Sequence, residues 1–141
     1  MAYWILKTEP STYSFQQLVK ERKTVWDGVK NPQAQSYIRS MESGDLLLIY
    51  HSGEGKCLVG LAEVLGMPYA DPKHPNLCVV EIAAKQALKT HVTLAEIKAK
   101  PAFAELKLVR QSRLSVVPVP KKMWDLLMKM TGEEKTRPKY P

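Results

Sequence analysis

The order of apolar and polar residues along this chain predicts a series of short β-strands. Apolar, aromatic and β-branched residues dominate positions 2–7, 45–51, 57–64, 77–83 and 114–119. Short runs of this kind between turn-forming residues are typical of strands. We expect the second and third runs to pair as a hairpin across a turn at 52–56. Residues 23–30 and 67–75 are expected to be loops, because Asp27-Gly28 interrupts the first and three prolines forbid regular pairing in the second.

Two helices are predicted between the first and second strands. Ser14 and Gln17 have the spacing of a capping box, and the apolar residues that follow predict a short amphipathic helix to about residue 21. Asn31 is expected to cap a second helix with Pro32 at its first position, where the missing N–H costs nothing. Gly44 ends this second helix.

The C-terminal half contains two further helix signals. Thr93 and Glu96 form a second capping box, which opens a short helix, and the proline at 101 is expected to begin another turn. Residues 121–130 are predicted to form the final helix, which Gly132 stops. Its apolar face comprises Met123, Trp124, Leu127, Met128 and Met130.

These elements predict an α+β fold. Strands and short helices are interspersed without a regular βαβ rhythm and without an internal repeat, which favours a small mixed sheet or barrel flanked by helices. With 141 residues, the chain has the size of one ordinary domain. We assign this domain to residues 1–132 and expect residues 133–141 to be a polar, flexible tail.

The charge balance favours a polyanionic partner. Lysine and arginine number 21 against 14 acidic residues, and a net charge of +7 is compatible with binding to RNA or DNA. The N-terminus lacks the order of a signal peptide and no apolar run has the length of a membrane span, so we expect a cytoplasmic protein without a membrane partner. Cys57 and Cys78 have neither CxxC spacing nor a nearby pair of histidines, which indicates buried strand residues and no metal or disulfide.

Five sequence segments form a more specific pattern. They are YWILKTEP at 3–10, WDGVKNPQAQ at 26–35, GDLLLIYHS at 44–52, VGLAEV at 59–64 and RLSVVPV at 113–119. In this order and spacing they resemble the EVE domain family of the PUA-like superfamily, over nearly the whole chain to about Met130. The resemblance implies a mixed, curved sheet or barrel of about five to six strands flanked by short helices. It also implies a module that binds a modified or flipped-out base of RNA or DNA.

The residues in these segments supply what a base pocket requires. A flipped base needs a flat surface for stacking, polar groups for its edge and cations for the flanking phosphates. Trp26 is the expected stacking surface and Asn31 offers both a donor and an acceptor. The other expected ligand contacts are His51, Ser52, Lys7, Thr8, Gly28 and Val29, and Lys30 and Arg113 are expected to meet the nucleic-acid backbone.

Several of these residues also have a purely structural interpretation. Trp26 is equally the type of residue that fills a core, and Asn31 is a good helix cap whether or not it binds a ligand. A histidine such as His51 on an apolar strand is more often a satisfied buried residue than a ligand. Lys7 and Arg113, taken singly, are typical solvated charges.

Two other classes of function compete with a base reader. A small hydrolase would need a nucleophile and a base, such as Ser52 with His51, or Cys57 with His74 or His91. Neighbouring residues on a strand point to opposite faces, and the sequence contains no G-x-S-x-G elbow, so we expect no catalysis. A protein-interaction adaptor would use the Pro-rich loop and the Met-rich final helix. The prediction is therefore a monomeric, cofactor-free reader of a nucleobase.

Overall fold

The computed structural model describes residues 1–53 and 55–133. In chain order the elements are β1 (Tyr3–Thr8), α1 (Phe15–Glu21), β2 (Lys23–Trp26), α2 (Pro32–Arg39), β3 (Leu46–His51), β4 (Cys57–Val64), β5 (Tyr69–Ala70), β6 (Cys78–Thr93), α3 (Leu94–Lys98), η1 (Pro101–Phe103), α4 (Lys107–Arg110), β7 (Val116–Pro118) and α5 (Lys121–Thr131).

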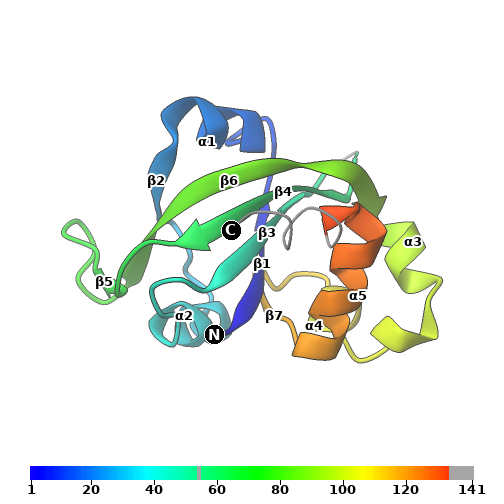
Figure 1. Ribbon diagram of the computed structural model, residues 1–141. Coiled ribbons are helices and arrows are strands. Elements are labelled where there is room, and N and C mark those ends of the chain that lie inside the picture. The colour runs from blue at the N-terminus through cyan, green and yellow to red at the C-terminus, as the bar shows by residue number, and fades with distance from the viewer. Residues whose placement is uncertain (54, 134–141) are drawn as a thin grey trace.

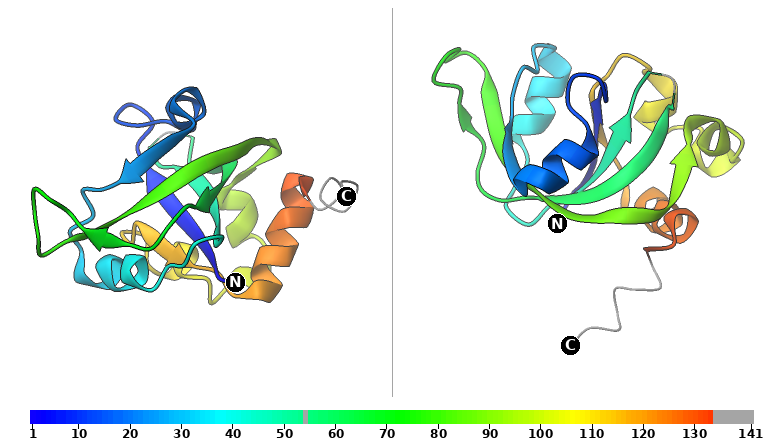
Figure 2. Two further views of the ribbon diagram at one scale, coloured as in Figure 1. Left: turned by 60° about the vertical axis from the view of Figure 1, so that its left-hand side comes forward. Right: turned by 90° about the horizontal axis from the view of Figure 1, so that it is seen from above.

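The strands form one strongly curved, mixed sheet. Its order is β2-β6-β4-β3-β1-β7, and the short β5 pairs with the start of β6. β1 and β3 are parallel, whereas every other pairing is antiparallel. Seen from above, the sheet bends into a half-barrel, with α3, α4 and α5 gathered at one end (Figures 1 and 2). The expected α+β fold with a curved sheet and short helices is confirmed.

The curvature has a local cause in the pairing of β4 with β6. Register shifts interrupt this ladder between Leu58 and Gly60 and again between Leu61 and Ala62. Such bulges bend a strand and increase its twist. β6 therefore continues over 16 residues along the curved sheet, far beyond the predicted strand at 77–83.

Two segments predicted to be loops contain strands. Lys23–Trp26 forms the edge strand β2, which pairs with Val80 to Ala83 of β6, so Trp26 is a strand residue. Tyr69–Ala70 pairs with Cys78 and Val79 inside the proline-rich segment. The pairing of β2 with β6 joins residues more than 50 positions apart, which a local pattern does not report. The pairing of β5 with β6 is a short hairpin between residues eight to ten positions apart, and its two β5 residues lie between the prolines that predicted a loop. Helix α4 was not predicted either.

The N-terminal caps of the helices follow the sequence, whereas α2 ends at Arg39 with Ser40 as its C-cap and not at the predicted Gly44. The Asn31 side chain accepts a hydrogen bond from the Ala34 N–H at 2.9 Å, which confirms it as the cap of α2. Thr93 and Glu96 form the complete reciprocal capping box. Ser14 accepts from the Gln17 N–H as expected, but the Gln17 side chain donates to Glu21 instead of returning to the cap.

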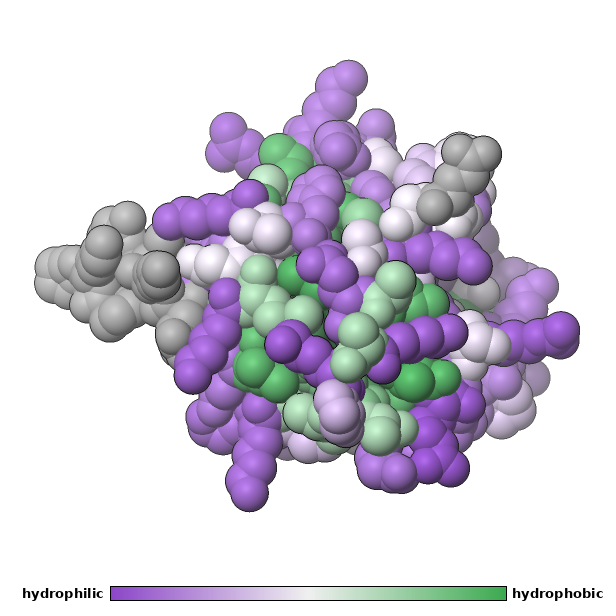
Figure 3. Space-filling model, turned by 90° about the vertical axis from the view of Figure 1, so that its right-hand side faces the viewer, coloured by the Kyte–Doolittle hydropathy of each residue, from purple (hydrophilic) through white to green (hydrophobic). Residues whose placement is uncertain are grey.

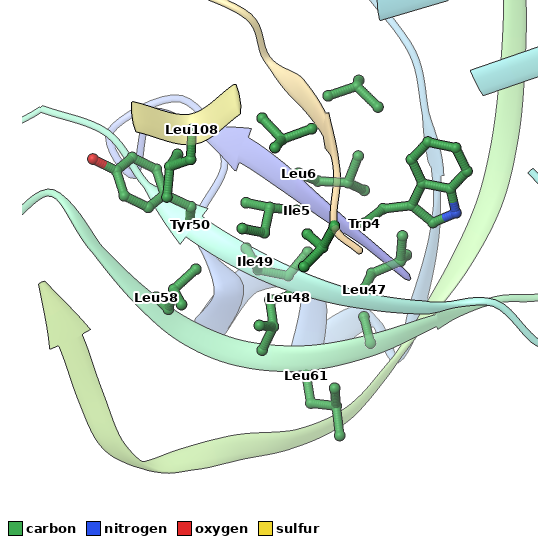
Figure 4. Close-up of a cluster of buried hydrophobic side chains, with 14 of the residues drawn as sticks. Trp4, Ile5, Leu6, Leu47, Leu48, Ile49, Tyr50, Leu58, Leu61 and Leu108 are labelled. Atoms are coloured by element: carbon green, nitrogen blue, oxygen red, sulfur yellow. The ribbon is translucent and has the colours of Figure 1, made fainter. Parts of the chain in front are cut away.

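The core lies between the sheet and its helices. β1, β3 and β4 contribute most of it, and β3 is buried along its four central residues. Figure 4 shows these side chains packed with Leu108 of α4. Trp124, Leu127 and Met128 of α5 are also buried, so the Met-rich face that an adaptor would expose belongs mainly to the core. On this side of the molecule the apolar areas are interrupted by hydrophilic side chains (Figure 3).

The C-terminal end of the described chain is anchored to the sheet. Glu133 is fully buried, and its Oε2 accepts a hydrogen bond from the Lys89 N–H at 3.1 Å. The rest of the expected tail, 134–141, lies outside the described residues. Among the described helices, none combines the length and apolar character needed to cross a bilayer.

Candidate nucleobase pocket

A cavity of about 580 Å³ lies where the two edges of the curved sheet approach each other. One edge contributes β2 and the loop after it, and the other contributes the end of β1 and Ser115, which directly precedes β7. This volume is in the range of small-molecule sites. Its lining residues are Lys7, Thr8, Glu9, Thr12, Tyr13, Thr24, Val25, Trp26, Asp27, Gly28, Val29, Lys30 and Ser115. Six of the ten predicted site residues are therefore brought together.

Trp26 is the large aromatic surface of this cavity. It is the last residue of β2, and its relative exposure is only 9%. Tyr13 packs against it at a centroid distance of 6.0 Å and an interplanar angle of 83°. The Tyr13 hydroxyl in turn donates to Glu21 at 2.6 Å, and burial together with this bond raises the pKa of Tyr13. Tyr13 thus fixes the indole without stacking on it.

The loop Asp27–Lys30 brings backbone groups to the cavity. Gly28 has φ +77°, a left-handed conformation that glycine adopts without steric cost, as the sequence predicted. The backbone N–H groups of residues 27–30 donate no hydrogen bond to any residue that the structure describes. Asp27, Gly28 and Lys30 are exposed, so water can satisfy their N–H groups and a ligand can replace that water. These N–H groups are therefore available to a ligand edge.

Gln35 holds this loop by hydrogen bonds on the side away from the cavity. It was not among the predicted site residues. The side chain is 2% exposed, and its Nε2 donates to the Val29 carbonyl at 2.7 Å and to the Cys78 carbonyl at 3.1 Å. Its Oε1 accepts from the Cys78 N–H at 2.8 Å. In a trans peptide, C=O and N–H point in opposite directions, so the N–H of Lys30 points away from Gln35. Gln35 follows Ala34 on the buried face of the helix, and this position was the signal in the sequence that could have identified it.

Lys7 and Thr8 form the opposite wall at the end of β1. The Thr8 hydroxyl donates to the Tyr13 carbonyl at 2.6 Å, which ties this wall to the Trp26 side. The Lys7 ammonium donates to the Ser112 carbonyl at 2.6 Å and lies 5.7 Å from the centre of the Tyr50 ring. Burial lowers the pKa of Lys7. Both residues thus support the cavity as well as line it.

His51 and Ser52 do not line this cavity, although the sequence analysis placed them in the site. His51 Nε2 accepts a hydrogen bond from the Phe15 N–H at 2.9 Å. The side chain therefore has a partner within the fold, as the structural interpretation of this histidine expects. Burial lowers the pKa of His51. The Ser52 N–H donates to the Thr8 carbonyl and so extends the pairing of β3 with β1. His51 and Ser52, at the end of the GDLLLIYHS segment, therefore make contacts that stabilise the fold.

Asn31 and Arg113 line a separate, neighbouring cavity of about 350 Å³. Arg113 is exposed, and it forms no ion pair with any described residue. In the main cavity, Glu9 and Asp27 stand beside Lys7 and Lys30, so its walls contain both signs of charge. Over the described residues, no cluster of three or more His, Cys, Asp or Glu is arranged to hold a metal ion.

Three comparisons relate this arrangement to known proteins. A protein of Rhodopseudomonas palustris, solved by NMR, is 43% identical and superposes with a TM-score of 0.89 over 94% of each chain. Human thymocyte nuclear protein 1 is 25% identical over 169 residues, which span 94% of this chain and 75% of that protein. The crystal structure of human THYN1 protein in complex with DNA containing 5-methylcytosine has a TM-score of 0.84 at 23% identity, covering 93% of this chain and 98% of that one.

The family comparison covers nearly all of the described residues. The EVE domain model matches residues 2–130, from β1 to the last turns of α5. The match includes both edges of the sheet and therefore every residue of the main cavity. This protein belongs to the EVE domain family.

Proposed function

We propose that this protein binds nucleic acid by holding one modified base in the Trp26 cavity, and that DNA containing 5-methylcytosine is the first ligand to test. The observation that supports this most directly is the cavity between the sheet edges. It combines an indole, unpaired backbone N–H groups and a volume of about 580 Å³ in one place. A relative of the same fold is known in complex with 5-methylcytosine DNA.

The cavity contents match the chemistry of a base. Stacking of a base on an aromatic side chain contributes about 1 to 3 kcal/mol, and it does not depend on base identity. The N–H groups of residues 27–30 are donors suited to the acceptor atoms of a base edge. Stacking and a few hydrogen bonds give weak binding by themselves, so the basic surface must add affinity through counterion release from phosphate.

We infer that the site binds without performing chemistry. His51 is occupied by the Phe15 N–H and cannot serve as a general base for its neighbour Ser52. Cys57 is half-buried, and burial raises its pKa, which lowers the fraction of reactive thiolate. The proposed binding of a base uses residues of one chain and requires no second copy, so we propose a monomer.

The test compares the wild type with Trp26→Ala and Trp26→Phe. Binding to short single- and double-stranded DNA, with cytosine or 5-methylcytosine at one position, is measured by fluorescence anisotropy, and matched RNA is included. We expect tighter binding to the methylated oligomer, a loss of this preference in the alanine variant and partial retention in the phenylalanine variant. Circular dichroism verifies that both variants are folded.

Equal binding by wild type and folded Trp26 variants would refute the pocket as the base site. A preference for another modified base in the same assay, lost with Trp26, would keep the proposed function and change only its ligand.

A further inference from the structure

The cavity that contains Arg113 directly adjoins the Trp26 cavity. It has a volume of about 350 Å³ and is lined by Asn31, Gln33, Arg110, Gln111, Ser112, Arg113 and Leu114. Lys30 and Leu114 mark two places where the walls meet: Lys30 of the first cavity precedes Asn31 of the second, and Leu114 of the second precedes Ser115 of the first. Since consecutive Cα atoms are about 3.8 Å apart, the two cavities share their border.

A side-chain hydrogen bond closes the same border. Lys7 of the first cavity donates to the Ser112 carbonyl of the second at 2.6 Å. The partition between the cavities is therefore built from the Lys7–Ser112 bond and the 30–31 peptide.

The two cavities differ in charge. The walls of the Trp26 cavity carry the carboxylates of Glu9 and Asp27 as well as Lys7 and Lys30, so these walls have no excess of positive charge to attract an anion. The second cavity is lined by two arginines, three amide or hydroxyl side chains at 33, 111 and 112, and Asn31, with no acidic residue among its lining residues. A phosphodiester is therefore more favoured in the second cavity than in the first.

The donors of the second cavity are oriented by the fold. The Oδ1 of Asn31 is used to cap α2, and because this fixes the amide, its Nδ2 remains as a donor without a described partner. Arg110 is held by two hydrogen bonds to Glu105, at 2.8 and 2.9 Å. Arg113 has no such acidic partner among the described residues and is the cation best able to meet a phosphate.

We propose that this second cavity is a phosphate subsite, which binds the phosphodiester next to the base held at Trp26. The inference rests on the proposed function of the Trp26 cavity. In this arrangement the Trp26 cavity selects the base. The second cavity binds the adjoining backbone and contributes affinity that does not depend on base identity.

The experiment measures binding of the full chain to a short, labelled single-stranded DNA with one central 5-methylcytosine, over a series of salt concentrations. Each phosphate contact with single-stranded nucleic acid adds about 0.7 to the slope of log K against log salt. Arg113→Ala should lower this slope by about 0.7 and weaken binding about fivefold near 0.1 M salt. Lys129→Ala is the matched control, because Lys129 is exposed on α5 and lines neither cavity.

A second ligand separates the subsite from the base site. Free 5-methyl-2′-deoxycytidine has no phosphate, so Arg113→Ala should leave its weak affinity, measured by NMR titration, unchanged, whereas Trp26→Ala should abolish it. Arg113→Lys keeps the charge but not the planar fork, and we expect an intermediate affinity for the oligomer.

The outcomes distinguish the two proposals. If Arg113→Ala and Lys129→Ala weaken oligomer binding equally while Trp26→Ala abolishes it, the phosphate subsite is refuted and the base site stands. If Trp26→Ala has no effect and Arg113→Ala still lowers the slope, the base site fails and the second cavity remains a phosphate site.

Discussion

The side-chain amide of Gln35 donates a hydrogen bond of 2.7 Å to the carbonyl oxygen of Val29. This bond connects the buried face of α2 to the loop that supplies the backbone donors of the Trp26 cavity. The same amide exchanges two hydrogen bonds with Cys78 at the beginning of β6. One side chain therefore sets the position of the loop relative to the sheet.

Replacing Gln35 should cost both stability and binding. Gln35→Leu keeps the size of the side chain but leaves three main-chain groups without partners, one buried at Val29 and two part-buried at Cys78, so we expect the free energy of unfolding to fall by about 2 to 4 kcal/mol. Urea denaturation measures this loss. Gln33→Leu, at an exposed position on the same helix, should change stability by less than about 0.5 kcal/mol. Equal stability of the two variants would contradict the role of Gln35 in holding the loop.

Gly28 should be sensitive to substitution through its backbone conformation. No heavy atom lies within 4 Å of a Cβ placed at this position, so the cost of Gly28→Ala is conformational, roughly 1 kcal/mol for the left-handed region. Gly28→Asn should cost less, because asparagine tolerates this region better. We expect oligomer affinity to fall more in the alanine variant than in the asparagine variant. The reverse order of affinities would show that side-chain contact, not backbone conformation, matters here.

Gly60 on β4 is limited by space instead. A Cβ at Gly60 would overlap the Phe15 ring. Gly60→Ala should therefore lower the free energy of unfolding by about 2 to 3 kcal/mol, as overpacked cores do. Gly66→Ala is the matched control, because nothing lies within 4 Å of its Cβ position.

A double variant tests the cause of the Gly60 effect. Phe15→Leu should recover part of the stability lost in Gly60→Ala, because it removes the ring that the new methyl group meets. Additive losses in the double variant would show that the ring is not the obstacle.

The bond between His51 and the Phe15 N–H predicts a pH-dependent stability. Burial, together with the nearby His91, lowers the pKa of His51 below its ordinary 6.5, while Glu9 acts in the opposite direction. Between the two pKa values the unfolded chain binds more protons than the native one, so stability rises with pH. The contribution is fully present above the unfolded-state pKa of 6.5 and is lost as the pH falls through the lower pKa of the folded state.

Urea denaturation at several pH values around 6.5, combined with an NMR titration of His51, measures this effect. His51→Gln should remove the dependence in that window. His74→Gln is the control, because His74 is exposed and should leave the dependence intact. A titration of His51 above 6.5 would contradict the prediction.

Interactions between residues close together in the chain allowed many elements of this protein to be predicted from its sequence. The five predicted strands exist, and Asn31 and Thr93 cap helices as expected, because capping depends on residues three positions apart. The resemblance to the EVE domain family implied the curved mixed sheet. Gly28 was identified for its conformational freedom and does adopt a positive φ.

Tertiary structure decided which candidates stand together. Trp26 meets Lys7 and Thr8 only because β2 and β1 lie near opposite edges of a sheet whose bend comes from bulges in β4 and β6. His51 belongs to the same sequence pattern, yet the folded chain uses it to bind the Phe15 N–H. Patterns in a sequence report interactions over a few residues, whereas this cavity is made by pairings between residues tens of positions apart, and those depend on the folded chain as a whole.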